Sequence, residues 1–272
     1  MRLIAVLDDA QTAALTLHTA GQLAARLGGA DICAFHPMPA TDPDFQSPDE
    51  GLPDPAQQAR FVQTVATRAH AIRQIFEYWR STAQSSPHAQ WMEQAGPPRT
   101  TLSLAASKAD FVVLGPASAA TTPTTRQSFA AALYDAQATV LIAPPTPQPG
   151  FGQHPVIAWQ DTPNLHRATA AAMPLLRTAE RVSILLGEHH PNAVADPTLL
   201  ATLRTLGVAV TLERFVLTEQ SVGEQLRARA TQAGADLLVM GAYGRPHFIE
   251  WLFGGPTVDL LAHATWPILT HH

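Results

Sequence analysis

The chain is poor in cysteine and lysine, and it lacks long apolar runs. Its one cysteine, Cys33, excludes an internal disulfide and any zinc site built on paired cysteines. Its one lysine, Lys108, lies between Ser107 and Ala109, so the Gly-Lys-Ser/Thr end of a phosphate-binding P-loop is absent. No Gly-x-Gly-x-x-Gly dinucleotide fingerprint follows a strand. No stretch approaches the roughly 18 to 20 apolar residues of a membrane-spanning helix.

Charge and the first residues give expectations about location and partners. The net charge at pH 7 is −5 and the cationic residues are dispersed, which leaves no basic stripe for a nucleic-acid backbone. Asp8 and Asp9 interrupt the first apolar run where a signal peptide would continue it. We therefore expect a soluble, cytoplasmic protein that has neither nucleic acid nor a membrane as its partner.

The strongest positive signal is an internal repeat. The segments that align in pairs are 109–115 with 235–241, 138–142 with 264–268, and 3–8 with 156–161. The first two pairs share an offset of 126 residues, and the third has an offset of 153, so the first copy carries 27 additional residues. We expect this insertion after the second strand of the first copy, in a loop that includes the Pro- and Asp-rich residues 37–55.

Each copy alternates short apolar runs with longer segments of helical period, which is typical of parallel strands joined by crossover helices. Strands are expected near residues 2–7, 30–36, 89–93, 110–115 and 138–143, and near 155–160, 181–187, 208–213, 236–241 and 266–270. The clearest helices span residues 55–80 and begin after Pro163. The sequence predicts an α/β fold of two tandem doubly wound domains, residues 1–146 and 152–272. Each is expected to be a five-stranded parallel sheet in the order 3-2-1-4-5 with helices on both faces.

That strand order places a switch point between strands one and four, where ligands bind at the carboxyl ends. In the second copy a glycine-rich segment follows strand four. Gly241 and Gly244 permit a tight turn, and Gly254 and Gly255 precede a proline that suits the first turn of a helix. The amides of Gly254, Gly255 and Thr257 would then face an anion at the positive end of the helix. From chemistry alone, the glycines are equally consistent with tight turns and nothing more.

The spacing of these glycines resembles the universal stress protein family. Its nucleotide-binding members carry Gly, two residues, Gly, nine residues, and then Gly followed by Ser or Thr. Gly241, Gly244 and Gly254 fall on this spacing, Gly255 stands where the hydroxyl residue is expected, and Thr257 could replace it. The resemblance covers nearly the whole chain twice. It implies an adenine nucleotide, ATP or AMP, bound in the second copy, with Mg²⁺ present only together with the nucleotide.

The resemblance also implies which residues hold the nucleotide. Asp161, at the end of the first strand, would contact the adenosine, and Gly187 would lie near the base. Arg245 and the loop glycines would lie near the phosphates. The expected binding residues are Gln160, Asp161, Gly187, Gly241, Gly244, Arg245, Gly254, Gly255 and Thr257. An alternative for Asp161, Thr162 and the corresponding Asp8 is that they cap the helices that follow.

The first copy lacks this loop, because Ser118, Ser128 and Phe129 occupy the positions of three of its glycines. We therefore expect a degenerate nucleotide loop and a structural role for this copy. Pro267 indicates that the last strand lies at an edge. The family resemblance implies that the fifth strands pair, either in a homodimer or in an intramolecular pseudo-dimer.

No catalytic or metal-binding residues are expected. Gly-x-Ser-x-Gly is absent, Cys33 is predicted inside a strand, and adjacent histidines such as His189 and His190 rarely converge on one ion. We expect a regulatory or sensor protein that binds an adenine nucleotide and is not an enzyme. Two alternatives are a stress-response scaffold or interaction protein that binds no nucleotide, and a slow ATP hydrolase.

Overall fold

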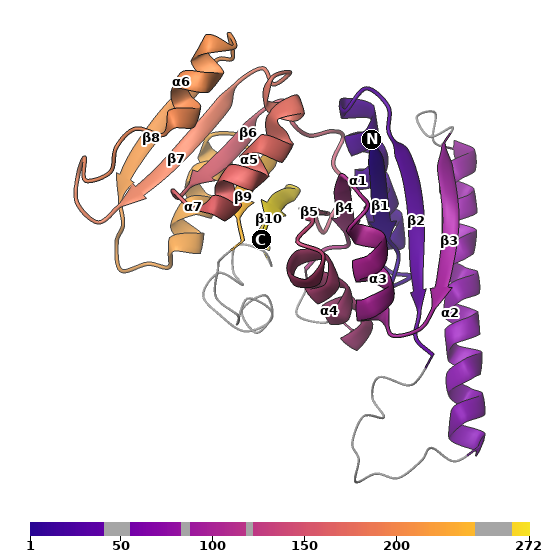
Figure 1. Ribbon diagram of the computed structural model, residues 1–272. Coiled ribbons are helices and arrows are strands. Elements are labelled where there is room, and N and C mark those ends of the chain that lie inside the picture. The colour runs from indigo at the N-terminus through magenta and orange to yellow at the C-terminus, as the bar shows by residue number, and fades with distance from the viewer. Residues whose placement is uncertain (41–54, 83–87, 118–121, 243–262) are drawn as a thin grey trace. The chain divides into compact units, whose positions relative to one another are not determined.

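The computed structural model describes residues 1–40, 55–82, 88–117, 122–242 and 263–272 (Figure 1). Contacts divide the chain into two compact units. Unit 1 comprises Met1–Gly115 with Ala120–Ala138, and unit 2 comprises Pro116–Ala119 with Thr139–His272. The units follow the two sequence copies, except that the fifth strand of the first copy falls in unit 2.

Unit 1 is built on a parallel sheet. Its elements are β1 (Arg2–Val6), α1 (Ala13–Arg26), β2 (Asp31–Met38), α2 (Pro55–Thr82), β3 (Ala89–Ala95), α3 (Pro98–Ala106), β4 (Phe111–Leu114), α4 (Pro123–Ala130) and the π-helix η1 (Ala131–Asp135). The strands lie in the order β3-β2-β1-β4 and all pair in parallel. Helix α1 packs against α2, and α3 packs against α4 and η1. All four residues of β4 and the last four of β1 are buried, as expected for strands that helices cover on both faces.

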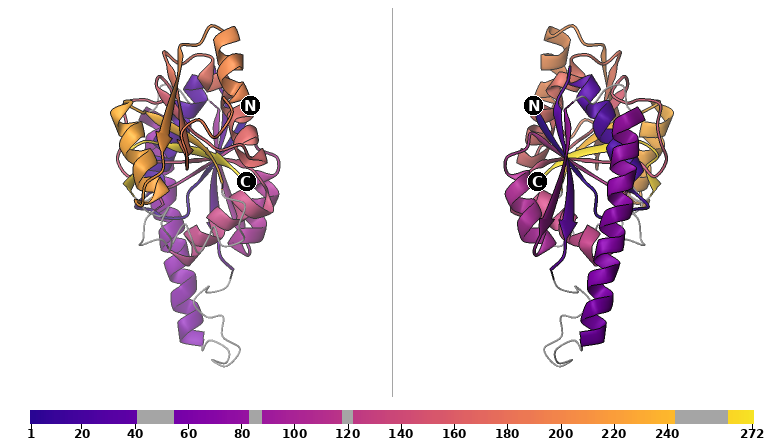
Figure 2. Two further views of the ribbon diagram at one scale, coloured as in Figure 1. Left: turned by 90° about the vertical axis from the view of Figure 1, so that its left-hand side faces the viewer. Right: turned by 90° about the vertical axis from the view of Figure 1, so that its right-hand side faces the viewer.

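Helix α2 accounts for much of the insertion in the first copy. It is 28 residues long and buries Val65, Ala69, Ile72 and Phe76 along one face, which confirms the helix expected over residues 55–80. Its N-terminal part extends beyond the ends of the strands of its own unit (Figures 1 and 2). The corresponding helix of the second copy, α6 (Thr198–Thr205), has only 8 residues. The loop expected over residues 37–55 is shorter than predicted at its start, since Pro37 and Met38 belong to β2, and most of the remainder lies outside the described residues.

Unit 2 repeats the pattern. Its remaining elements are β5 (Thr139–Ile142), β6 (Pro155–Trp159), α5 (Pro163–Leu176), β7 (Val182–Glu188), β8 (Val210–Val216), α7 (Val222–Gln232), β9 (Leu237–Gly241) and β10 (Ile268–His271). The second copy has the strand order β8-β7-β6-β9-β10, all parallel, which confirms the predicted order 3-2-1-4-5. The switch point lies between β6 and β9, where the carboxyl ends of both strands reach the same edge.

The fifth strands of the two copies pair with each other. β5 runs antiparallel to β10, with Ile142 opposite Ile268 and Thr139 opposite His271. This is the intramolecular pairing expected from the sequence, whereas a homodimer stays a prediction. Pro267 lies just before the first paired residue of β10, Ile268, and its carbonyl accepts a hydrogen bond from the amide of Leu238 at 3.0 Å. The edge expected at the last strand is covered, because β10 lies between β9 and β5.

The helix after β6 begins as its sequence predicts. Thr162 is the N-cap of α5, and its Oγ1 accepts a hydrogen bond from the amide of Leu165 at 3.3 Å. Pro163 follows at the first helical position, where a missing amide hydrogen costs nothing. This confirms the capping alternative for Thr162. Asp161 is not the cap.

Candidate functional site

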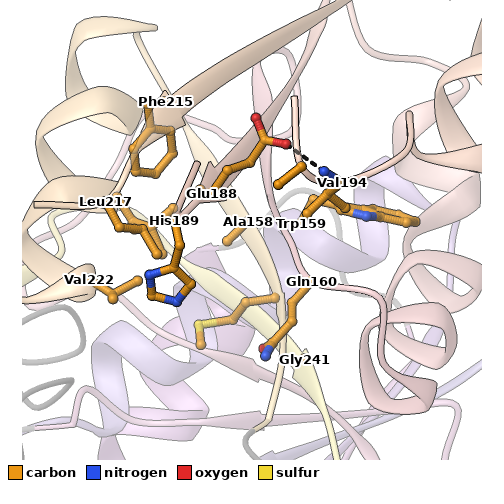
Figure 3. A pocket seen from close by; sticks show the side chains of 14 residues that line it. Ala158, Trp159, Gln160, Glu188, His189, Val194, Phe215, Leu217, Val222 and Gly241 are labelled. Atoms are coloured by element: carbon orange, nitrogen blue, oxygen red, sulfur yellow. Dashed lines mark hydrogen bonds between the residues drawn. The ribbon is translucent and has the colours of Figure 1, made fainter. Parts of the chain in front are cut away.

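A pocket of about 460 Å³ lies at the carboxyl ends of β6, β7, β8 and β9, at the switch point of unit 2 (Figure 3). The residues that line it are Ala158, Trp159, Gln160, Gly187, Glu188, His189, Ala193, Val194, Phe215, Leu217, Val222, Leu226, Met240 and Gly241. Its volume falls within the range of about 300 to 1,000 Å³ that is usual for small-molecule sites. It lies where open α/β sheets bind their ligands.

The lining is mainly apolar, with polar side chains from two strand ends. Apolar side chains supply most of the surface, among them Phe215, Leu217 and Val222. Gln160 follows β6 and His189 follows β7, and both residues are exposed at the rim. Figure 3 shows their side chains reaching toward the same space. Such a pocket suits a planar, largely apolar group that carries polar atoms on its edge.

The ring of Phe215 is held by the side chain of Arg229, which does not line the pocket. The guanidinium carbon of Arg229 lies 3.9 Å from the centre of the Phe215 ring, and Arg229 Nε lies 3.4 Å from Glu213. A cation over an aromatic face is attracted by the ring quadrupole. The ring is therefore fixed as one wall of the pocket.

Glu188 is a buried carboxylate at the end of β7, with a side chain 2% exposed. Its Oε1 accepts hydrogen bonds from the amide of Val194 at 2.8 Å and from Arg214 Nη1 at 2.7 Å. The Val194 amide does most to lower the pKa of Glu188, and the hydrogen bond and charge of Arg214 lower it further. Figure 3 shows the carboxylate turned toward Val194 and away from the space between His189 and Gln160. The negative charge of Glu188 is therefore paired with Arg214 and is not directed into the pocket.

Two of the predicted glycines lie in close contact with other elements. A Cβ at Gly187 would lie 2.9 Å from Leu217 Cδ2 and 3.1 Å from Phe215 Cζ, which are both lining residues. A Cβ at Gly241 would lie 2.8 Å from the backbone nitrogen of Leu165, in the first turn of α5. Gly187 thus leaves room for the pocket wall, and Gly241 lets the start of α5 approach β9.

Asp161 lies outside the pocket lining. Its side chain is 76% exposed, and its Oδ1 accepts a hydrogen bond from His166 Nε2 at 2.7 Å, one turn into α5. The ring of His166 in turn meets the edge of Trp159, with centroids 5.6 Å apart. One of its two carboxylate oxygens is thus engaged by His166, and contact between Asp161 and a ligand stays a prediction.

The structure brings together three of the nine predicted residues. Gln160, Gly187 and Gly241 line the pocket, and Asp161 does not. The others, Gly244, Arg245, Gly254, Gly255 and Thr257, lie outside the described residues. Sequence reasoning missed Glu188, His189 and Val194, together with the wall formed by β8 and α7. The available signal was that His189 directly follows the second strand, at the same sheet edge as Gln160.

The corresponding position in the first copy is filled by its own side chains. Asp8, the counterpart of Asp161, is only 4% exposed and lies against Ser128 and Thr125 of α4. Burial is the main cause that raises its pKa to about 6, and the hydroxyl groups of Ser128 and Thr125 counteract the rise. The switch point of unit 1 is thus covered by α4.

A second substitution closes the first copy further. By strand register, His36 stands where the second copy has Gly187. It is fully buried, its Nδ1 donates a hydrogen bond to the carbonyl of Leu7 at 2.6 Å, and it stacks on Trp91 with centroids 6.0 Å apart. Burial lowers the pKa of His36, which favours the neutral ring. An imidazole therefore fills the space that a glycine leaves open in unit 2.

Within residues 1–40, 55–82, 88–117, 122–242 and 263–272, no helix is both long and apolar enough to cross a bilayer. Those ranges also contain no group of three or more His, Cys, Asp and Glu side chains that could hold a metal ion.

A doubly wound α/β sheet with a pocket at its switch point defines the class of Rossmann-like ligand-binding domains. Residues 156–272, which make up the second copy, match the model of the Universal stress protein family. No curated protein matches the sequence at a significant level.

Solved structures extend the likeness in fold to both copies. A universal stress protein from Archaeoglobus fulgidus DSM 4304 aligns with a TM-score of 0.75 and 14% identity, over 98% of this chain and 94% of that chain. A functionally unknown protein from Pseudomonas aeruginosa PAO1 aligns with a TM-score of 0.53 and 13% identity, over 98% and 91%. At these identities the likeness shows a shared fold.

Proposed function

We propose that the second copy binds one adenine nucleotide, ATP or AMP, and that the chain acts as a cytoplasmic regulatory or sensor protein. The observation that carries the proposal is the pocket at the β6–β9 switch point, which Gln160, Gly187 and Gly241 line. The base would occupy the apolar part beside Phe215. The phosphates would lie beyond Gly241, where the glycines that follow the family spacing continue the chain.

The pocket wall supports binding rather than catalysis. Glu188 is the one carboxylate among the described lining residues, and its Oε1 is bonded to Val194 and Arg214. These contacts lower the pKa of Glu188, whereas a general base works best with a pKa near the operating pH. The lowered basicity of Glu188 favours a regulatory ligand over the slow ATP hydrolase.

The first copy is proposed to be a structural partner that binds no nucleotide. Its switch point is covered by α4, and His36 occupies the place of Gly187. The first copy would thus serve only as a scaffold, while the second copy keeps an open pocket.

Replacement of Gly187 by valine tests the proposal directly. The added side chain meets Leu217 and Phe215 and narrows the pocket, so we expect calorimetric titration to show AMP and ATP affinities lowered by about tenfold or more. Gly150→Val is the matched control, because a Cβ there has no heavy atom within 4 Å. If the wild-type chain takes up neither nucleotide at millimolar concentration, the proposed function is wrong.

A further inference from the structure

The segment that follows β7 folds around the carboxylate of Glu188. Besides the amide of Val194, the amide of Asn192 contributes a hydrogen bond that lowers the pKa of Glu188. Asn192 has a φ of +57°, the left-handed conformation that asparagine adopts more readily than most residues. A tight turn therefore directs two backbone amides, those of Asn192 and Val194, toward one buried acceptor.

Arg214 connects this turn to β8. Its Nη1 donates to Glu188 and, at 2.9 Å, to the carbonyl of Val194, while its Nη2 bonds to Asp196. Its side chain is 23% exposed, so the guanidinium is largely withdrawn from water. One cation thus holds both ends of the segment between Val194 and Asp196 against the neighbouring strand.

The same segment is a wall of the pocket. His189, Ala193 and Val194 line the cavity, and Figure 3 shows the bond between Val194 and Glu188 beside it. A buried carboxylate needs all its hydrogen-bond donors, because an unpaired buried charge is strongly unfavourable. If Arg214 or the charge of Glu188 is removed, the turn loses its fixed geometry and the wall with it.

We propose that Glu188 and Arg214 are positioning residues for ligand binding in the second copy. They hold residues 189–196 in the bound-state geometry before the ligand arrives, so that little ordering entropy is lost on binding. Neither presents its charge to the ligand. The inference rests on the proposed function, since it concerns the affinity of the same pocket.

The test compares AMP affinity by calorimetry at 25 °C in the full-length wild type, Arg214→Met, Glu188→Gln and the double variant. We expect each single variant to bind AMP about tenfold more weakly, and the double variant to lose no more than about that factor, because both act through one interaction. Arg204→Met, which removes an exposed arginine from α6, is expected to bind as the wild type does. Glu188→Gln keeps the size of the side chain, so it folds even if Arg214→Met does not.

A structural role alone would leave the affinity of the folded protein unchanged. If the wild type binds AMP and both single variants bind it within about twofold of the wild type, the positioning role is wrong while the proposed function stands. If the wild type binds no adenine nucleotide, both fail together. Multiplicative losses in the double variant would also overturn the inference, because they would show two independent effects.

Discussion

Replacement of Gly241 by alanine is expected to destabilise unit 2 by about 1 to 3 kcal/mol and to lower nucleotide affinity by about tenfold or more. The added Cβ would lie 2.8 Å from the nitrogen of Leu165 and 3.3 Å from the carbonyl carbon of Asn164. These are backbone atoms in the first turn of α5, so no rotamer change can relieve the clash. The helix start must move away from β9, and the hydrogen bond from Asn164 Nδ2 to the carbonyl of Ala242, 2.7 Å long, moves with it.

Urea unfolding and AMP titration measure the two effects in Gly241→Ala, with Gly150→Ala as the control at an open position. Wild-type stability in Gly241→Ala would show that the close approach of α5 and β9 does not constrain the fold. The packing account of this glycine would then be wrong.

Replacement of Asp8 by asparagine is expected to stabilise the chain by about 1 to 3 kcal/mol at pH 7.5 and to leave its stability at pH 4 unchanged. Asp8 has a pKa of about 6 in the folded state, against 3.8 for an unperturbed aspartate, mainly because of burial. The folded state therefore holds the proton more tightly than the unfolded state does. The favourable contribution is complete below pH 3.8 and is lost as the pH rises to about 6, which costs the folded state about 3 kcal/mol above that pH.

Urea unfolding of both proteins at pH 4 and pH 7.5 measures this difference. Asp31→Asn, at an exposed aspartate of the same unit, is the control and should show no comparable gain at pH 7.5. A loss of stability in Asp8→Asn at pH 7.5 would mean that the ionised carboxylate is satisfied within the fold. The closed state of the first switch point would then need another explanation.

The fold could be predicted because its signals are local and occur twice. Parallel strands covered on both faces are continuous apolar runs, so nine of the ten expected strands differ from the observed ones by at most two residues at either end. The exception is β8, which runs to Val216, whereas the sequence suggested an end at 213. Along β8, half-buried residues alternate with exposed ones, and Glu213 and Arg214 in its middle are charged. Its apolar signal in the sequence is therefore weak.

The site could be predicted only in part, because most of its contacts join segments that are distant in sequence. The topology pointed to Gly241 at the end of strand four, and the family resemblance added Gln160 and Gly187; all three line the pocket at this edge. The salt bridge between Glu188 and Arg214 spans 26 residues and depends on the register of β7 and β8. Asp161 shows that a contact between residues close in sequence can also be missed. A histidine five residues later in the helix engages its carboxylate, and no strand pattern predicts that hydrogen bond.

The two copies show how one fold gives an open and a closed switch point. The open copy has Gly187 beside Phe215 and an exposed Asp161, whereas the closed copy has His36 and a buried Asp8. These exchanges change side-chain volume at the carboxyl edge without changing the strand order. A repeat that shares its topology can therefore differ in ligand binding through a few positions at the strand ends.

The most direct measurement is hydrogen exchange of the full-length chain with and without saturating AMP. We predict protection in segments 158–160, 187–194 and 215–226, which border the pocket of unit 2, and no change in segments 7–12 and 124–128 of unit 1. Protection in the unit 1 segments, or none around the unit 2 pocket, would contradict the claim that the second copy alone provides an open nucleotide site.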